Sequence, residues 1–188
     1  MVRVAHMLMP GLATQAANLA LYRRTPNWIA GSPGYCDKIP EATHWLMNNM
    51  PFYSNWFGNT CFIRGRQIPP LQVHDREWQT QGGFVNQQSD AMRKGLTEYV
   101  RAKVKGNTEL AKKLTPSYAP LVRRLVVDNG FYDALPKDNV ELVTEPIATF
   151  TEDGITTKDS QHRQFDLVVL ACGFKPKEYL WPIKFTAA

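Results

Sequence analysis

The sequence predicts an α/β fold organised around parallel strands, the class in which nucleotide-binding sheets occur. The first observation is a nearly uninterrupted apolar run at residues 167–171, entered through Asp166 and ending near Gly173. Such a run is typical of a strand buried on both faces, and ligands of these sheets lie beyond the carboxyl ends of the strands. The second observation is a short apolar run, 19–22, that follows a helical pattern and ends in Arg23-Arg24. An ordinary buried strand before a glycine turn remains the alternative for residues 166–173.

The N-terminal residues predict a helix followed by a strand. Residues 5–18 have a helical pattern that Pro10-Gly11 interrupts or kinks. Residues 19–22 then predict a strand that runs into a turn, because Pro26 disfavours a helical conformation of the residue before it. We therefore expect the chain to begin inside a βαβ unit whose first strand is absent.

An aromatic helical segment follows. Pro40 favours a helix start, and Pro51 should kink or divide the helix. Large apolar residues share one face of it: Leu46, Met50, Tyr53 and Phe57, broadened by Trp45 and Trp56. This stripe favours a core, or a wall against another domain, over contact with a cofactor. Residues 58–84 are rich in turn formers and predict a long irregular loop.

The second half of the chain predicts two helices and several strands. Ser89 is expected to cap a helix that reaches Lys105, and Thr108 a shorter one that ends at Leu114. The remaining elements are strands at 125–127 and 140–143, a turn at 128–130, a helical turn at 131–135, and a hairpin that pairs 148–151 with 155–157.

Composition limits the class of protein. The chain has 188 residues, 44% of them hydrophobic and 21% charged, which suits one domain or a piece of a larger enzyme. No apolar run reaches the ~18 residues that a membrane span needs. The three cysteines are far apart and no secretory leader pattern precedes them, so we expect no disulfide framework and a cytoplasmic location.

Charge and histidine content exclude two further classes. The net charge is +5, but the basic pairs are dispersed and no nucleic-acid motif accompanies them. We therefore expect no nucleic-acid partner, and attribute the excess to solvated helix faces and to sites for an anionic dinucleotide. The four histidines form no metal-ligand motif, so no metal site is expected.

Arg23 and Arg24 are the first candidates for chemistry. They follow a strand where a dinucleotide fold has its second β-strand, and a basic residue there suits the 2′-phosphate of NADP. An exposed basic turn is the equal alternative. The phosphate-binding G-x-G-x-x-G turn occurs nowhere in the chain. Cys172 is better explained as a small core residue than as a nucleophile, because the sequence places no histidine near it.

Several segments, in unbroken order, resemble the Baeyer–Villiger (flavin-containing) monooxygenase family. They are Leu21 to Trp28, Leu114 to Pro120, Arg123-Arg124, Asp128 to Tyr132, Asn139 to Val143, Pro146-Ile147, Asp153 to Ile155, Asp166 and Ala171 to Phe174. The middle of the chain, with Trp45 to Phe57, Ser89-Asp90 and Arg93, is most similar to the 4-hydroxyacetophenone monooxygenase branch. Each segment is short, and their combination is what makes the resemblance specific.

The resemblance implies chemistry that depends on FAD and NADPH. Oxygen adds to reduced flavin, and the resulting flavin peroxide converts a ketone or aldehyde to an ester or lactone, with an aromatic ketone suggested by the branch. Arg24 corresponds to the catalytic arginine, whose fixed charge stabilises the anionic adduct. Arg23 and Thr25 correspond to cofactor-binding positions, with Arg23 at the 2′-phosphate. Asp166, Cys172 and Gly173 would approach FAD.

Asp128, Asn129 and Gly130 would lie on the substrate side. Cys172 stands where the family usually has threonine.

The resemblance divides the chain into the end of an NADP domain (1–30), a helical region (31–115), and the strands that return to the NADP and FAD domains (116–188). The fold class is thus an incomplete two-dinucleotide-binding flavoprotein fold.

Two hypotheses follow from the missing glycine-rich turns. In the first, the chain is a truncated or split monooxygenase, and a second polypeptide supplies those turns. In the second, it is a catalytically inactive remnant that acts as a binding or scaffolding protein.

Overall fold

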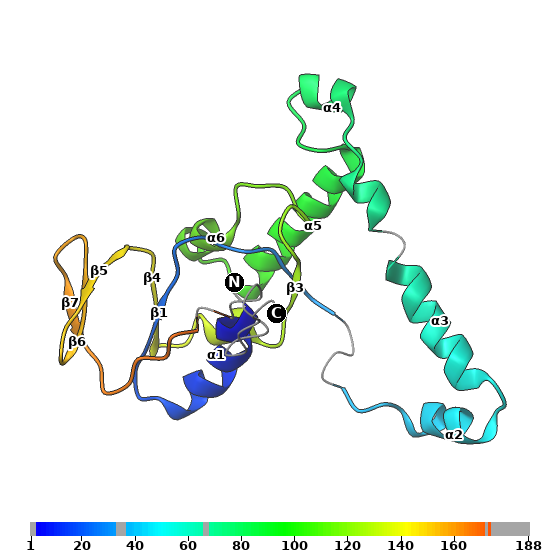
Figure 1. Ribbon diagram of the computed structural model, residues 1–188, viewed down its shortest axis with the longest axis horizontal. Helices are drawn as coiled ribbons and strands as arrows, with labels where there is room; N and C mark the ends of the chain where they lie inside the picture. The colour runs from blue at the N-terminus through cyan, green and yellow to red at the C-terminus, as the bar shows by residue number, and fades with distance from the viewer. Residues whose placement is uncertain (1–2, 33–36, 66–67, 172, 174–188) are drawn as a thin grey trace, which may run out of the picture. The chain divides into compact units, whose positions relative to one another are not determined.

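A computed structural model describes residues 3–32, 37–65, 68–171 and 173. The chain forms two compact units (Figure 1). Unit 1 combines residues 1–24 with 137–188, and unit 2 comprises residues 25–136. Unit 1 is therefore discontinuous in sequence, and unit 2 is inserted between its two parts. The predicted boundaries after residues 30 and 115 both fall within unit 2, and that division of domains stays a prediction.

Unit 1 is built on a parallel pair of strands. Helix α1 (Arg3–Gln15) contains Pro10 and leads within three residues to β1 (Leu19–Tyr22). Strand β1 pairs in parallel with β4 (Val140–Val143), with Leu19 opposite Val140 and Tyr22 opposite Val143. Both strands were predicted from the sequence, and the parallel pairing agrees with the predicted α/β class.

A three-stranded antiparallel sheet completes unit 1. It has the order β5 (Ile147–Phe150), β6 (Gly154–Thr157), β7 (His162–Gln164). The hairpin of β5 and β6 confirms the prediction, whereas β7 was missed because its polar residues lack an apolar alternation. Gly154 is required here: a Cβ on it would lie 2.0 Å from the carbonyl oxygen of Arg163 on β7. Arg163 also donates two hydrogen bonds to the Glu141 carboxylate on β4, at 2.7 and 3.1 Å.

Unit 2 has a helical core beside a second parallel pair, β2 (Ile29–Ala30) and β3 (Val126–Val127). Its longest helix is α5 (Gln87–Lys103), followed by α6 (Thr108–Leu114) and the single turn α7 (Phe131–Ala134). The core side chains share near-complete burial: Trp28, Ile29, Val100, Val104, Leu114, Phe131 and Tyr132. The predicted capping residues Ser89 and Thr108 were wrong. Asn86 and Asn107 accept the first-turn amides instead, because each lies one residue before its helix.

Helices α2 (Glu41–Asn49) and α3 (Tyr53–Gly65) form a helical hairpin in unit 2. Pro51 divides them as predicted, and Phe52 next to it has a positive φ of 62°. The aromatic stripe is not part of the core, because Trp45 and Trp56 are each 62% exposed and Phe52 is 83% exposed. The other expectation, a wall against another domain, stays a prediction. No described element of unit 2 packs over this face.

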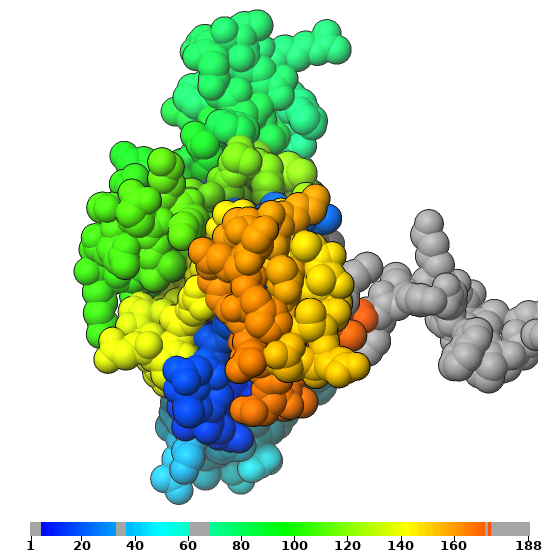
Figure 2. Space-filling view, turned by 90° about the vertical axis from the view of Figure 1, so that its left-hand side faces the viewer, coloured from blue at the N-terminus to red at the C-terminus, as the bar shows by residue number. Residues whose placement is uncertain are grey.

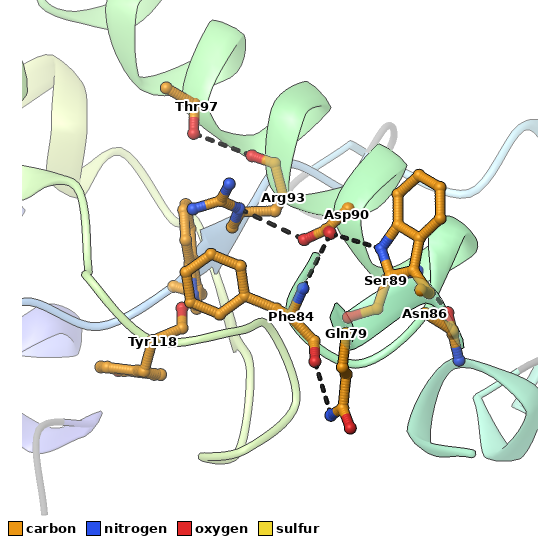
Figure 3. A network of polar contacts seen from close by, with 10 residues as sticks. Gln79, Phe84, Asn86, Ser89, Asp90, Arg93, Thr97 and Tyr118 are labelled. Atoms are coloured by element: carbon orange, nitrogen blue, oxygen red, sulfur yellow. Dashed lines mark hydrogen bonds and ion pairs between the residues drawn. The ribbon is translucent and has the colours of Figure 1, made fainter. Parts of the chain in front are cut away.

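Residues 68–86 are more ordered than the predicted loop. They contain the short helices η1 (Pro69–Gln72) and α4 (Arg76–Thr80). Asp90 in the first turn of α5 accepts hydrogen bonds from the Trp78 indole at 2.8 Å and from the Phe84 amide at 3.0 Å (Figure 3). Arg93 forms an ion pair with Asp90 at 3.5 Å and lies 4.1 Å above the Phe84 ring. These side-chain contacts, which no periodic sequence pattern indicates, hold the segment.

The predicted buried strand at residues 167–170 was wrong for the described structure. The segment forms no strand and pairs with no described strand, and Leu167 and Leu170 are 75% and 72% exposed. Burial on both faces needs neighbouring strands and covering layers. No described element of unit 1 provides them.

Candidate functional site

The carboxyl end of β1 carries the first predicted site residues, and the structure gives them different environments. The Arg23 amide donates to the Val143 carbonyl oxygen at 2.9 Å, which continues the ladder with β4. The Arg23 side chain is buried at 9% exposure, whereas Arg24 is exposed. Among the residues that the structure describes, no carboxylate forms an ion pair with Arg24. Arg24 is therefore the guanidinium available to an anionic ligand.

Within unit 2, the loop that follows Arg24 is fixed by polar contacts. Thr25, the third predicted cofactor-binding residue of this region, is half-buried at the start of that loop. The Tyr118 hydroxyl donates to Asn27 Oδ1 at 2.6 Å and lies 3.1 Å from the Pro26 carbonyl oxygen. The Trp28 indole donates in turn to the Tyr118 carbonyl oxygen at 2.8 Å. The loop thus has one defined path from Pro26 to β2.

A second basic pair lies beside this loop. The Asn27 side chain donates to the Arg124 carbonyl oxygen at 3.4 Å, and the Arg123 guanidinium lies 4.9 Å from the centre of the Tyr118 ring. Both arginines are exposed and directly precede the strand region of β3. The sequence interpretation noted this pair without assigning it a role. The sequence alone could have pointed to this pair, because it shows a second pair of arginines directly before a short apolar strand.

Asp128, Asn129 and Gly130 form the turn after β3, at the carboxyl end of the parallel pair in unit 2. The buried Asp128 carboxylate accepts hydrogen bonds from the amides of Gly130 and Phe131 at 3.0 and 2.9 Å. Gly130 has a φ of 97° and precedes α7. Asp128 therefore fixes the turn, while Asn129 is half-buried at its centre.

Tyr99 on α5 holds the other oxygen of that carboxylate. Its hydroxyl donates to Asp128 Oδ2 at 2.8 Å. Burial raises the pKa of Tyr99 well above its ordinary value, and the hydrogen bond to the Asp128 carboxylate raises it further. A Cβ at Gly31 would lie 2.9 Å from the Tyr99 ring, so the small residue after β2 leaves room for this contact. Sequence patterns could not reveal the Tyr99–Asp128 pair, since 29 positions separate the two residues.

The residues predicted to approach FAD lie at the end of the described chain. Asp166 is exposed, and Cys172 lies outside the described residues. Gly173 is exposed with a φ of 84°, a conformation that favours glycine and agrees with the predicted turn. The structure does not bring Asp166 into contact with any charged partner among the described residues.

An apolar groove of about 280 Å³ lies in unit 1. It is bordered by α1, by all four residues of β1, by the β5–β6 hairpin, by Phe165 and by residues 167–171. In Figure 2 the blue surface of the N-terminal segment lies beside the orange surface of residues near 165. The edge-to-face contact of Tyr22 with Phe165, with ring centres 6.1 Å apart, lies along this groove.

The described part of the chain lacks both a metal-ligand cluster and a membrane-spanning helix. It contains no cluster of histidine, cysteine, aspartate or glutamate that could hold a metal ion. None of its helices is long and apolar enough to cross a membrane.

Comparison with known proteins identifies the relatives of the chain. No protein-family model matches it. An FAD-binding monooxygenase of Aspergillus niger, ktnD, is 32% identical over 189 aligned positions, which cover 98% of this chain and 28% of that protein. A Baeyer–Villiger monooxygenase of Pseudomonas aeruginosa is 25% identical over 172 positions, covering 90% of this chain and 30% of its own length. The chain thus spans less than a third of the length of these curated relatives.

Solved structures give the same result at the level of the fold. A cyclohexanone monooxygenase variant of Rhodococcus sp. Phi1 bound to NADP⁺ matches with a TM-score of 0.66 and 18% identity, over 95% of this chain and 38% of that one. A steroid monooxygenase bound to NADP matches with a TM-score of 0.63 and 22% identity, over 87% of this chain and 35% of that one. The predicted incomplete α/β flavoprotein fold is therefore confirmed. Over nearly its whole length, this chain resembles one segment of the flavin-dependent, Baeyer–Villiger-type monooxygenases.

Proposed function

We propose that the chain is part of a monooxygenase that depends on FAD and NADPH and inserts oxygen next to a carbonyl group. In this reaction NADPH and a proton supply the reducing equivalents, one atom of O₂ enters the substrate C–C bond, and the other leaves as water. A ketone or aldehyde then gives an ester or lactone. The observation that carries the proposal is an exposed arginine at the carboxyl end of a parallel strand, in a chain whose relatives are monooxygenases.

The end of β1 suits the phosphate of NADPH. Ligands of parallel sheets lie beyond the carboxyl ends of the strands, and guanidinium groups bind phosphate through paired hydrogen bonds. The exposed Arg24 side chain can reach such a group, whereas the Arg23 side chain is buried at the end of the β1–β4 ladder. The family resemblance instead assigns the 2′-phosphate to Arg23 and the stabilisation of the anionic adduct to Arg24. The two assignments make different kinetic predictions.

FAD would supply the chemistry that activates oxygen. The described residues do not form a phosphate cradle for it, because no glycine-rich turn occurs in the sequence. Gly173, with its positive φ, is suited to a close backbone approach. We therefore propose that a second polypeptide, or a further part of the same protein, supplies the glycine-rich turns.

The turn 128–130 is proposed to line the substrate side. Both Asp128 oxygens are already engaged by Tyr99 and by the turn amides. Asp128 would therefore act through the shape of the turn rather than by direct proton transfer. An aromatic ketone is the proposed substrate class, on the resemblance of the middle of the chain.

The test uses a complementing polypeptide, which is the Aspergillus niger relative with the residues aligned to this chain deleted. The chain is co-expressed with it, supplied with FAD, and assayed with NADPH and 4-hydroxyacetophenone for ester formation. The deleted Aspergillus niger segment, expressed separately in the same way, is the positive control for the split format. If that control forms ester and this chain does not, the proposed function is refuted.

Arginine variants then separate the two assignments. A lost phosphate contact should raise the KM for NADPH by roughly 10- to 100-fold and leave the KM for NADH unchanged. Our structural assignment expects this effect for Arg24→Ala, with partial recovery in Arg24→Lys. The family-based assignment expects it for Arg23→Ala, with loss of kcat for Arg24→Ala. If each variant loses the same activity with NADPH as with NADH, a phosphate role for either arginine is contradicted.

A binding or scaffolding role is the second candidate, favoured by exposed apolar surface. Leu167, Leu170 and Phe52 are each more than 70% exposed. This role predicts that the purified chain binds no flavin and oxidises no NADPH even when the complementing polypeptide and FAD are present.

A further inference from the structure

The turn at residues 128–130 is held by two sets of hydrogen bonds that do different work. Asp128 Oδ1 accepts from the amides of Gly130 and Phe131, which lie two and three positions further along the chain. Bonds this local fix the shape of the turn. Asp128 Oδ2 accepts from the Tyr99 hydroxyl on α5 at 2.8 Å. That second bond fixes where the turn lies relative to the longest helix of unit 2.

The Tyr99 ring is confined by its neighbours. It makes an edge-to-face contact with the Tyr132 ring, with ring centres 6.0 Å apart, and the Lys103 ammonium lies 5.8 Å from its centre. On another side, a Cβ at Gly31 would lie only 2.9 Å from the ring. A ring confined in this way has little freedom to rotate, so its hydroxyl remains directed at Asp128.

Helix α5 holds the residues after the turn as well. Lys103 lies four positions after Tyr99, on the same helix face, and its ammonium donates to both carboxylate oxygens of Asp133 on α7, at 2.6 and 2.9 Å. The Lys103 and Asp133 side chains are 31% and 56% exposed, so solvent weakens this pair. The Tyr99–Asp128 bond is part-buried and carries more of the positioning.

We infer that Tyr99 is a positioning residue for the carbonyl substrate, which it affects through Asp128 by holding the turn 128–130 in place on α5. The inference rests on the proposed function, in which this turn lines the substrate side. Asp128 gives the turn its shape, and Tyr99 gives it its location. Loss of the Tyr99 hydroxyl therefore leaves the hydrogen bonds inside the turn intact and lets the turn shift relative to α5.

The kinetics of Tyr99→Phe in the complex with the complementing polypeptide and FAD test this role. A displaced wall binds the ketone less well in the ground state and the transition state alike. The KM for 4-hydroxyacetophenone should therefore rise roughly tenfold, while kcat and the KM for NADPH stay unchanged. A purely structural role would instead reduce the fraction of folded complex, which lowers kcat and leaves the KM for the ketone unchanged. That result would overturn the inference.

Tyr53→Phe is the matched control. It makes the same chemical change in unit 2, on the exposed α2–α3 hairpin, and should leave the KM for the ketone unchanged. Thermal unfolding followed by circular dichroism verifies that each variant is folded. Equal rises of this KM in Tyr53→Phe and Tyr99→Phe would contradict a role specific to Tyr99.

Gly31→Ala is a second variant, which keeps the hydroxyl and displaces the ring. The φ of Gly31 lies outside the left-handed region, so the change acts through the added Cβ. It should also raise the KM for the ketone. Because both changes break the same hydrogen bond, the double variant should show no larger rise than the more severe single variant. A rise equal to the product of the two single effects would contradict the inference.

Ketone binding separates this inference from the proposed function. The Kd for 4-hydroxyacetophenone is measured from the absorbance of oxidised flavin in the complex, without turnover. A higher Kd in Tyr99→Phe, with no ester formed by the unsubstituted complex, would support the positioning role and refute oxygen insertion. Ester formation with the same Kd and KM in both proteins would support the function and overturn the positioning role. A complex that neither binds nor oxidises the ketone would refute both.

Discussion

The hydrogen bonds of Asp90 predict that one carboxylate determines much of the stability of unit 2. Asp90 is 17% exposed and accepts from the Trp78 indole and the Phe84 amide, at 2.8 and 3.0 Å. Each hydrogen bond to a charged acceptor contributes about 1.5 kcal/mol or more, so Asp90→Ala should reduce the free energy of unfolding by about 3 kcal/mol. For a unit of this size the Tm should fall by roughly 10 °C.

The assay is chemical and thermal unfolding followed by circular dichroism at neutral pH. Glu98→Ala is the control, because Glu98 is exposed on the same helix and none of the ion pairs includes it. That variant should change stability by less than about 0.5 kcal/mol. If Asp90→Ala unfolds at the same denaturant concentration as Glu98→Ala, the network in Figure 3 does not stabilise unit 2 and our reasoning is refuted.

The same carboxylate predicts a pH dependence. Burial alone would raise the pKa of Asp90, but hydrogen bonds from Phe84 and Trp78, together with the charge of Arg93, hold it below its ordinary value. A group with a lowered folded-state pKa stabilises the protein above its unfolded-state pKa, and this contribution is lost as the pH falls through the folded-state value. The stability difference between the unsubstituted chain and Asp90→Ala should therefore be constant near neutral pH and shrink below about pH 4. A difference that grows on acidification would contradict this assignment.

Three further predictions concern the turn after β3, the β6–β7 pair and the helical hairpin. Tyr99→Phe leaves Asp128 Oδ2 without its hydroxyl donor, so it should lower the free energy of unfolding measured in urea by about 1–2 kcal/mol. An unchanged free energy of unfolding would contradict this. Gly154→Ala should separate β6 from β7, because its Cβ would meet the Arg163 carbonyl, and faster amide exchange at Thr157 and Phe165, which donate across this pair, would report it. Phe52→Gly should stabilise the α2–α3 hairpin by up to about 1 kcal/mol, since Phe52 has a φ of 62°, and slower amide exchange there is the test.

The sequence predicted β1, β4 and the β5–β6 hairpin of unit 1, because each has a local pattern, whereas β7 and residues 167–170 were not predicted correctly. Leu19–Tyr22 is a short apolar run, Val140–Val143 is apolar except for Glu141, and both are strands. The turn at Glu152 to Gly154 likewise joins the two strands of the predicted hairpin. The resemblance to flavin monooxygenases then supplied the fold that these elements belong to, which composition alone could not do.

Two of the errors share one physical cause, which is that burial depends on neighbours outside the local sequence. Residues 167–170 have the pattern of a buried strand, yet no described strand pairs with them. The aromatic stripe of α2 and α3 has the pattern of a core, yet Trp45 and Trp56 face solvent in unit 2. In both cases the pattern indicates that a surface is suited to burial, and the covering layer has to come from elsewhere.

The candidate site was predictable only in part for the same reason. The position of Arg23-Arg24 after a strand was clear from the sequence, but the burial of Arg23 and the exposure of Arg24 were not. The contact of Asn27 with Arg124 joins residues 97 positions apart, so no spacing could indicate it.

The most direct test of the proposed monooxygenase is the fate of labelled oxygen. The chain, its complementing polypeptide, FAD, NADPH and 4-hydroxyacetophenone are combined under ¹⁸O₂, and the ester is analysed by mass spectrometry. We predict one ¹⁸O atom in each ester molecule, and a strongly reduced yield with Arg24→Ala. Ester without label, or NADPH oxidation without ester while the Aspergillus niger control produces it, would contradict the account.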